Sequence, residues 1–350
     1  MKKGVSCLIA VLISIMVSSA YATHSFLGLE MFQSQEGDSD QGLDGSYHMR
    51  LLEVEKAWEL TQGSRAIKVA LITTGANYKL DALKSNIEIN MSEMSGRNGV
   101  DDDGNGYIDD IYGANTLIGS GNPMDFNGLG TFVASLVGGA NVGMLKQISI
   151  IPINPFTDQG WGTIVSTVKA VQYAISRGAQ IIELGFGGGS KDAQKAMCAA
   201  IEEGGKHDIL FIATAGNSNQ NIDDDDTTMY PAACSNDNLL VGTTTDQNDE
   251  LASYANWGFR RVHVTAPGQF LLGFNHLGQP TKYAGGSVSN GVITAVAALA
   301  LSANPHLTYK QLKDVLIYSV DPIPALAGKV SSGGRLNALS AVRLARSIPQ

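Results

Sequence analysis

The 350-residue sequence predicts an α/β fold, in which a mostly parallel central sheet lies between two layers of helices. Short apolar runs of the length of buried strands recur along the chain, at 68–72, 148–153, 180–184, 209–214 and 239–243. Stretches with helical spacing of apolar residues lie between or after these runs, at 130–137, 162–174, 192–203 and from about 287, 308 and 336. Buried strands that alternate with helices are typical of a parallel sheet covered on both faces.

The composition indicates a compact domain and disfavours some partners. Apolar residues make up 44% of the chain and charged residues 16%, with 40 glycines, which is typical of a loop-rich globular core. The net charge is −9. Nucleic acids and anionic membranes attract a basic face, so we expect neither as a partner.

The first residues have the features of a signal peptide. Lys2 and Lys3 precede an apolar stretch over about 5–17, and Ala20 and Ala22 stand where a signal peptidase reads small residues. The apolar stretch is short for a membrane span, although an uncleaved anchor is the alternative. We therefore expect residues 1–22 to be a cleaved signal peptide and the protein to be secreted or periplasmic.

Two further segments and one cysteine pair remain after cleavage. Residues 23–46 are polar and are expected to form a flexible lead-in, and residues 47–347 to form one domain. Cys198 and Cys234 are the cysteines of the mature chain. Export favours a disulfide between them, and two buried thiols are the alternative.

The ends of the predicted strands carry the informative residues. Ligands of parallel sheets bind beyond the carboxyl ends of the strands. Three such ends stand out in this chain: Thr-Thr-Gly at 73–75, Leu-Gly-Phe-Gly-Gly at 184–188, and Thr-Ala-Gly-Asn-Ser at 214–218. We expect these three segments to meet at one site.

Seven segments in order resemble the subtilisin-like serine protease (subtilase) family. They lie at 69–75, 127–134, 215–218, 253–258, 266–268, 285–289 and 332–338. The resemblance extends from about residue 47 to 345. It implies a three-layer α/β/α subtilisin-like fold, and several ordered matches are far more specific than any one of them.

The same resemblance implies that the catalytic set is incomplete. Thr73 stands where the family has the catalytic aspartate, and Leu129 stands where it has the histidine. Ser287 and Asn217 keep the nucleophile and oxyanion positions. A serine hydroxyl needs an adjacent base, which leucine cannot provide. Leu129 instead begins an apolar helical stripe with Phe132, Val133 and Leu136.

Purely structural roles are the alternative for the two retained residues. Ser287 could cap the helix that follows it, and Asn217 could form a turn after its strand. Glu183 is a carboxylate in an apolar strand, for which we expect a hydrogen-bonded structural role. His276 is the histidine nearest in sequence to the serine segment and is the candidate for a substitute base.

The resemblance also implies a peptide groove. Leu184, Gly185, Phe186 and Gly187 match the strand end that lines the substrate in the family, where a peptide adds as a strand. The main hypothesis is a pseudoprotease that binds a peptide or protein, such as an active protease or its substrate, without cleaving it. The alternatives are a weak serine hydrolase that uses Ser287 with Asn217, a structural envelope protein, and a glycine-rich turn without ligand.

An acidic loop is the candidate metal site. Residues 101–110 place oxygen-bearing side chains at alternate positions with glycine at the sixth, as at the start of a calcium loop. A solvated loop is the alternative, and it is also our interpretation of the acidic run at 223–226. The expected Ca²⁺ ligands are Asp101, Asp103, Asn105, Tyr107, Asp109 and Asp110.

Overall fold

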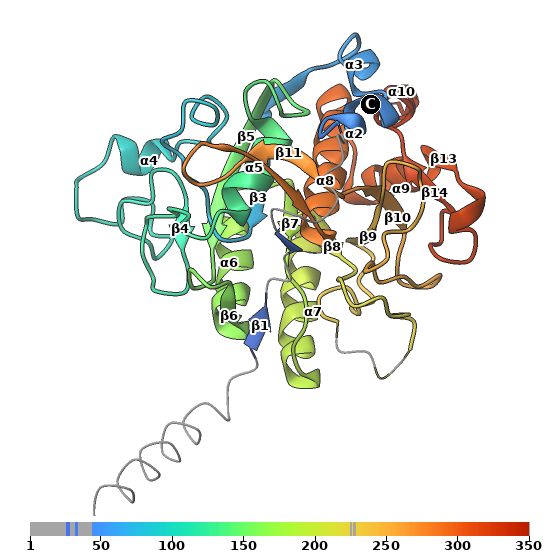
Figure 1. The fold of residues 1–350 in the computed structure, drawn as a ribbon. Coiled ribbons are helices and arrows are strands. Elements are labelled where there is room, and N and C mark those ends of the chain that lie inside the picture. Colours follow the sequence, from blue (N-terminus) through green and yellow to red (C-terminus); the bar gives the residue numbers. More distant parts are fainter. Residues whose placement is uncertain (1–25, 29–31, 34–43, 225, 227–228, 350) are drawn as a thin grey trace, which may run out of the picture.

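A nine-stranded sheet forms the centre of the molecule (Figure 1). The computed structural model describes residues 26–28, 32–33, 44–224, 226 and 229–349. All neighbouring strands of the sheet run parallel except β13 and β14. In spatial order the strands are β13 (Val320–Pro322), β14 (Gly334–Leu336), β10 (Val264–Pro267), β9 (Leu239–Thr245), β8 (Leu210–Thr214), β7 (Ile181–Leu184), β3 (Gly63–Ile72), β5 (Gln147–Asn154) and β4 (Ala114–Asn115).

Helices cover both faces of this sheet, and strand β3 shows why. Val69 and Leu71 belong to one buried cluster, together with residues of α5, α8, α9 and α10. Ala70 and Ile72 point to the opposite face and belong to a second cluster, with residues of α6 and α7. Successive side chains of a strand point to opposite faces, so an uninterrupted apolar run needs a core on each side. The predicted three-layer α/β/α fold is confirmed.

The predicted strands and helices are present. The five apolar runs form β3, β5, β7, β8 and β9, and the helical patterns form α5 to α10. Their bounds are α5 (Leu129–Gly138), α6 (Ile164–Ser176), α7 (Lys191–Lys206), α8 (Gly286–Ala303), α9 (Tyr309–Tyr318) and α10 (Ala338–Ser347). The shorter helices are α2 (Tyr47–Leu51), α3 (Val54–Ala57), α4 (Met91–Met94) and a 3₁₀ turn at Pro324–Leu326.

Helix α8 is the long central helix of one core. Among the described residues it is the one helix long and apolar enough to cross a membrane, but 89% of its most apolar window is buried inside the domain. It contacts α5, α9 and α10, as well as five strands of the sheet. Burial on all sides explains why this helix is apolar around its whole circumference.

Two small sheets lie outside the central one. Strand β1 (Phe26–Gly28) pairs with β6 (Trp161–Thr163), and the two lie side by side in Figure 1. The second sheet has the order β11 (Leu271–Phe274), β12 (Pro280–Ala284) and β2 (Phe32–Gln33).

The predicted flexible lead-in over residues 23–46 is therefore wrong for β1 and β2. Their backbone groups pair with the edges of β6 and β12, which a polar composition does not reveal. The predicted signal peptide at residues 1–22 lies outside the described residues.

A disulfide joins helix α7 to a later loop. Cys198 and Cys234 are bonded, with 36 residues of sequence separation and a Cα–Cα distance of 5.6 Å. The predicted pairing is confirmed, and the alternative of two free thiols is excluded.

Candidate functional site

A small pocket lies beside Ser287, where β7 and β8 end and α8 begins. Its volume is about 10 Å³, which leaves room for one water-sized group. This is the carboxyl-end location at which parallel sheets bind ligands. The residues that line it are Gly185, Phe186, Gly187, Thr214, Gly216, Asn217, Met229 and Ser287.

The hydroxyl of Ser287 is engaged with the neighbouring strand end. Ser287 is the second residue of α8 and is 3% exposed. Its Oγ donates a hydrogen bond to the carbonyl oxygen of Gly185 at 2.7 Å. The N-cap of α8 is Gly285, which makes no side-chain capping bond. The expectation that Ser287 caps this helix is therefore wrong, because its side chain points to β7 instead.

Asn217 supports the start of α8 in place of the serine. Its Oδ1 accepts a hydrogen bond from the backbone N–H of Gly286 at 2.8 Å. A Cβ at position 286 would lie 2.1 Å from Oγ1 of Thr214, so only glycine fits there. The amide of Asn217 is thereby fixed against the N-terminus of α8, next to Ser287 in the pocket lining.

Thr73 and Leu129 lie together, as the resemblance implies for the aspartate and histidine positions. Gly130, the residue after Leu129, lies against Thr73, because a Cβ at Gly130 would lie 2.6 Å from Oγ1 of Thr73. Gly130 also donates its N–H to Oγ1 of Thr74 at 2.8 Å. Thr73 is fully buried, and its Oγ1 has no hydrogen-bond partner among the described residues.

The apolar stripe of α5 is core. Its four members are buried in one cluster with α8, as predicted: Leu129, Phe132, Val133 and Leu136. Leu129 is 1% exposed and does not line the pocket at Ser287.

Asp125 holds the start of α5, and no sequence pattern singled it out. Its Oδ1 accepts the N–H groups of Asn127 and Gly128, both at 2.9 Å. Its Oδ2 accepts the N–H and the hydroxyl of Thr131 at 2.8 and 2.7 Å. An anionic group is favourable at a helix N-terminus, where backbone donors lack partners. Aspartate shortly before an Asn-Gly turn is the signal that could have identified it.

Met229 fills the space between the two strand ends. A Cβ at Gly187 would lie 2.5 Å from its Sδ, and a Cβ at Gly216 would lie 2.5 Å from its Cε. The thioether therefore packs between the glycine-rich segments that follow β7 and β8. No pattern around Met229 predicted this, since methionine adapts to irregular gaps of many kinds.

Leu184 does not contribute to this site. Of the four residues predicted to bind substrate, Gly185, Phe186 and Gly187 line the pocket, whereas Leu184 is fully buried in the core below α6 and α7. It is the last residue of β7, and its side chain points to the opposite face of the sheet from α8.

Glu183 lies directly beneath the pocket. Its Oε1 is 2.8 Å from the position that a Cβ would take at Gly185, and it accepts a 2.6 Å hydrogen bond from Nδ2 of Asn290 in α8. Complete burial raises the pKa of Glu183 to about 8, while the bond from Asn290 acts in the opposite direction. The carboxyl group is therefore mostly protonated at pH 7. The predicted structural, hydrogen-bonded role fits this contact.

Among the residues that the structure describes, no side chain in the lining of the Ser287 pocket accepts a proton at neutral pH, since these lining residues are Gly, Phe, Thr, Asn, Met and Ser. His276 lies beside the N-cap of α5, Gly128. Its Nδ1 is 3.2 Å from the position that a Cβ would take at Gly128, and it is absent from the lining.

The fold and these segments agree with known proteins. The sequence model of the subtilase family matches residues 64–338, which is more than half of the chain. The chain belongs to the subtilase family. The relatives with curated names include a subtilase called subtilisin-like protease 1 from Plasmodium vivax, which is 28% identical over 88% of this chain and 52% of its own length.

Two further matches extend the comparison. The halolysin-like extracellular serine protease Nep of Natrialba magadii is 27% identical over 81% of this chain and 49% of its own length. This subtilase chain thus spans about half the length of both relatives. A cold-adapted subtilisin-like serine proteinase has the same fold, with a TM-score of 0.62 and 24% identity over 79% of this chain and 89% of that one.

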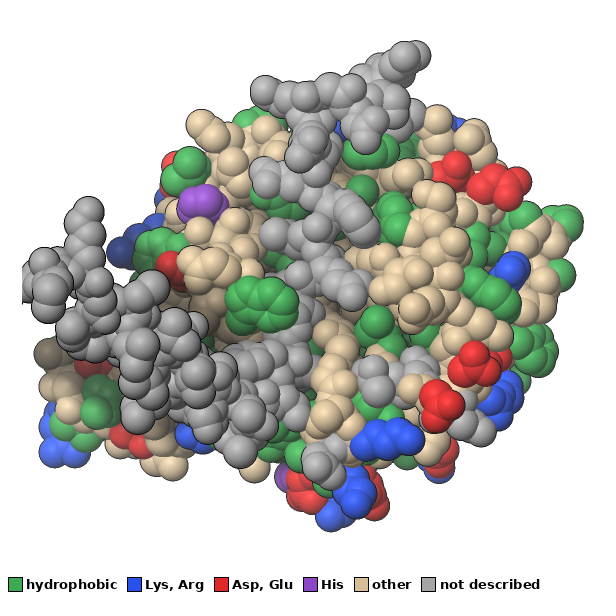
Figure 2. Space-filling model, turned by 60° about the horizontal axis from the view of Figure 1, so that its bottom comes forward, with side chains coloured by type: hydrophobic (Ala, Val, Ile, Leu, Met, Phe, Trp, Pro, Cys, Tyr) green, Lys and Arg blue, Asp and Glu red, His purple; other side chains and the backbone are tan. Residues whose placement is uncertain are grey.

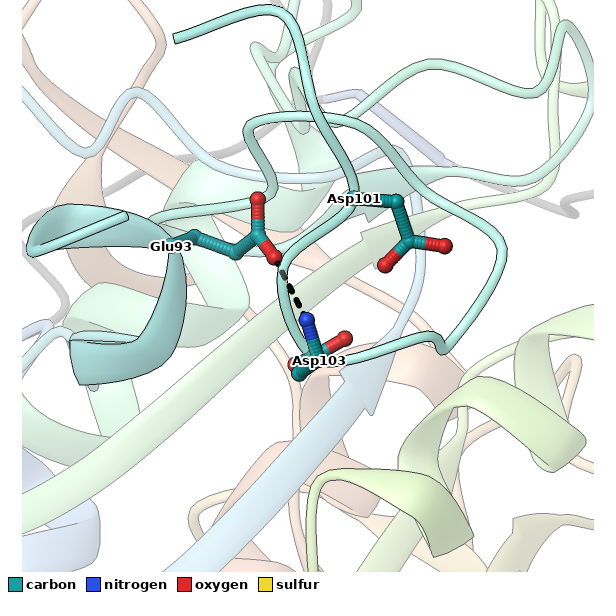
Figure 3. Close-up of side chains that lie close together, drawn as sticks. All are labelled: Glu93, Asp101 and Asp103. Atoms are coloured by element: carbon teal, nitrogen blue, oxygen red, sulfur yellow. Dashed lines mark hydrogen bonds between the residues drawn. The ribbon is translucent and has the colours of Figure 1, made fainter. Parts of the chain in front are cut away.

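The acidic loop brings three carboxylates together in this subtilase. Figure 3 shows Glu93, from helix α4, beside Asp101 and Asp103 of the loop. One oxygen of each lies within 4.8 Å of the others. Oε1 of Glu93 also accepts the backbone N–H of Asp103 at 3.1 Å. Glu93 comes from outside the loop, so the spacing within 101–110 could not predict it.

The other predicted ligands of this loop contact protein groups. Asp110 forms a buried ion pair with Arg177 at 3.0 Å, and Asp109 accepts the N–H of Gly99. Asn105 donates its amide to Asp103 and Asp110, and the ring of Tyr107 packs edge-on against Tyr173. The guanidinium of Arg177 compensates the charge of Asp110, and the prediction of Asp110 as a ligand stays a prediction.

Proposed function

We propose that this subtilase is a pseudoprotease that binds an extended peptide or protein without cleaving it. The observation that carries the proposal is the hydroxyl of Ser287. It donates to the carbonyl oxygen of Gly185 at 2.7 Å, in a pocket whose described lining residues include no proton acceptor at neutral pH. A serine without a base is a poor nucleophile, and the narrow pocket beside Met229 leaves little room for a side chain of a substrate.

The proposed function includes export. The bonded pair of Cys198 and Cys234 supports an oxidising compartment, since disulfides persist there and are rare in the cytosol. The name of the Natrialba relative, an extracellular protease, agrees with this. Secretion or a periplasmic location would place the protein where peptide and protein partners of subtilases occur.

A fluorophosphonate probe tests the absence of catalysis. Such a probe labels a serine only when a base activates it. We expect no labelling of the wild-type protein by intact mass spectrometry, with an active subtilase as positive control. Stoichiometric labelling that disappears in Ser287→Ala would favour the alternative, a serine hydrolase that uses Ser287 with Asn217.

Heavily fluorescein-labelled casein tests binding without cleavage. This substrate brightens when it is cut, and its anisotropy rises when it is bound. We expect a rise in anisotropy without brightening over a day. Brightening would contradict the proposal. If fluorescence and anisotropy both stay constant, the result contradicts the peptide-binding part and favours a purely structural protein.

We also propose that the acidic loop binds Ca²⁺. Glu93, Asp101 and Asp103 offer the carboxylate oxygens that this hard cation prefers. A ligand at 100 times its dissociation constant stabilises the folded state by about 2.7 kcal/mol. We expect calcium to raise the melting temperature relative to chelator, and the double variant Glu93→Gln/Asp101→Asn to abolish the difference. Glu59→Gln, at an exposed position, is the control. Equal melting temperatures of the wild-type protein with calcium and with chelator would contradict the site.

A further inference from the structure

Two hydrogen bonds join the end of β7 to the first turns of helix α8. Oγ of Ser287 donates to the carbonyl oxygen of Gly185 at 2.7 Å. Nδ2 of Asn290 donates to Oε1 of Glu183 at 2.6 Å. Ser287 and Asn290 are three residues apart, so they lie on the same face of α8. The two bonds together fix the strand end against the helix beside the pocket.

The carboxyl group of Glu183 also lies against Gly185. Its Oε1 is 2.8 Å from the position that a Cβ would take at Gly185, and Cγ2 of Thr73 is 3.2 Å from the same position. The backbone N–H of Gly185 donates to the carboxyl group. The N–H of Gly185 is therefore directed to Glu183 and its carbonyl oxygen to Ser287, so both side chains position this backbone segment.

The neutral carboxyl group suits this contact. Oε1 of Glu183 accepts the bond from Asn290, and Oε2 has no hydrogen-bond partner among the described residues. Oε2 can therefore carry the proton while Oε1 remains an acceptor. Glu183 and Asn290 are both fully buried, and an unpaired charge at such a place is strongly destabilising.

The elements packed against Glu183 bring no other charge to it. Leu71 of β3 and Ile212 of β8 lie opposite Glu183 in the sheet, and α8 contributes Asn290. Thr73 follows on β3, and none of these four side chains titrates. Burial and the hydrogen bonds from Asn290 and Gly185 are the causes of the altered pKa of Glu183. Glu183 is therefore the group here that can respond to pH.

The surface near the pocket adds little charge. β6 packs on Phe156, since a Cβ at Gly162 would lie 2.5 Å from that ring, and Phe156 meets Phe186 of the pocket lining edge-on at 5.4 Å. Figure 2 shows the face at the bottom of Figure 1, where β6 lies. The charged side chains visible there lie mainly toward its edge, and those visible near its middle are uncharged.

We propose that Glu183 is a positioning residue of the peptide site, whose neutral form holds the segment from Gly185 to Gly187 in the conformation that a peptide binds. The inference rests on the proposed peptide-binding function and adds a control by pH. An ionised Glu183 needs water or further donors. Either water enters from the pocket or the end of β7 moves away from α8, and a peptide that covers the pocket opposes both.

The titration of Glu183 sets the size of the effect. Burial raises its pKa to about 8. When only the neutral form binds, the apparent dissociation constant is the intrinsic one divided by the neutral fraction. That fraction is about nine tenths at pH 7 and about one tenth at pH 9. The affinity for a peptide should therefore fall about tenfold between these values.

Binding titrations of the full mature chain at pH 6, 7, 8 and 9 test this proposal. The probe is casein labelled with tetramethylrhodamine, and the readout is its anisotropy. We expect wild type to lose about tenfold in affinity between pH 7 and pH 9, relative to Glu183→Gln, which cannot ionise. Glu202→Gln, at an exposed position, is the matched control and should follow wild type.

Amide NMR of Gly185 and Gly187 gives a second readout, which needs no ligand. Both signals should shift with a midpoint near pH 8 in wild type and in Glu202→Gln, but not in Glu183→Gln. Far-UV circular dichroism at each pH establishes that all three proteins remain folded.

The outcomes separate this proposal from the peptide-binding function. Casein binding with the same pH dependence in wild type and Glu183→Gln would overturn the positioning role and leave the peptide-binding function intact. Glycine signals that do not titrate would do the same. Absence of casein binding at every pH would contradict the peptide-binding function, and the positioning role with it.

Discussion

The buried carboxyl group of Glu183 makes the stability of the domain depend on pH. Its pKa is about 8 in the folded protein, because burial disfavours the charged form, against an ordinary value of 4.5. Between these values the folded state keeps a proton that the unfolded state releases. The free energy of unfolding therefore falls as the pH rises from 4.5 to about 8, and this contribution is constant outside that window.

The substitution Glu183→Gln removes this dependence while it keeps the shape of the side chain and an acceptor for Asn290. The pKa difference corresponds to about 1.4 kcal/mol per pH unit, or ~5 kcal/mol over the whole window. At pH 7 the wild-type protein has lost about 3 kcal/mol of this amount. We expect the variant to gain stability over wild type by these amounts as the pH rises.

Urea unfolding at pH 5, 6, 7, 8 and 9 measures the effect. The difference in unfolding free energy between Glu183→Gln and wild type should grow to about pH 8 and then level off. The exposed Glu202→Gln is the control and should show a constant difference. A constant difference for Glu183→Gln as well would refute the reasoning, because it would mean that the carboxyl group titrates alike in both states.

Three other substitutions have defined outcomes. Burial lowers the pKa of His48 to about 4, so the unfolding free energy of the protein falls as the pH falls from 6.5 to 4. The substitution His48→Phe should remove ~3 kcal/mol of this decrease, as measured by urea unfolding. Cys198→Ser/Cys234→Ser opens a loop closed over 36 residues and should lower the unfolding free energy by about 3–4 kcal/mol. Asp125→Ala leaves the start of α5 without its four hydrogen bonds and should cost about 3 kcal/mol, whereas Asp125→Asn should cost less. If the cysteine double variant melts at the wild-type temperature, the disulfide prediction is contradicted. If Asp125→Ala does so, the prediction for Asp125 is contradicted.

The sheet and its helices could be predicted because burial imposes a period on the sequence. The run at 68–72 is apolar at almost every position, since Val69 and Ala70 face different cores. The stripe that begins at Leu129 repeats every three to four residues, since α5 packs against α8. Such patterns are local, and they survive without any knowledge of the partner surface.

The details of the site depend on residues that are distant in sequence. Met229 reaches the pocket from a loop that no periodicity marks, and Glu93 joins Asp101 from a separate helix. Asp110 has the right spacing for a calcium loop but meets Arg177, 67 residues later. The pairing of β2 with β12 joins residues some 250 positions apart. Side chains of this kind are placed by tertiary contacts, which a local pattern cannot encode.

The position of α8 determines when the domain can fold during synthesis. This helix comes late in the chain, yet it packs against α5 and against five strands of the sheet that precede it. A nascent chain that ends before residue 286 therefore leaves one face of those strands without its cover. Contacts between such distant residues form slowly, because a long loop must close first. We expect the chain to stay unfolded until its last quarter has been made, which would suit the export proposed above.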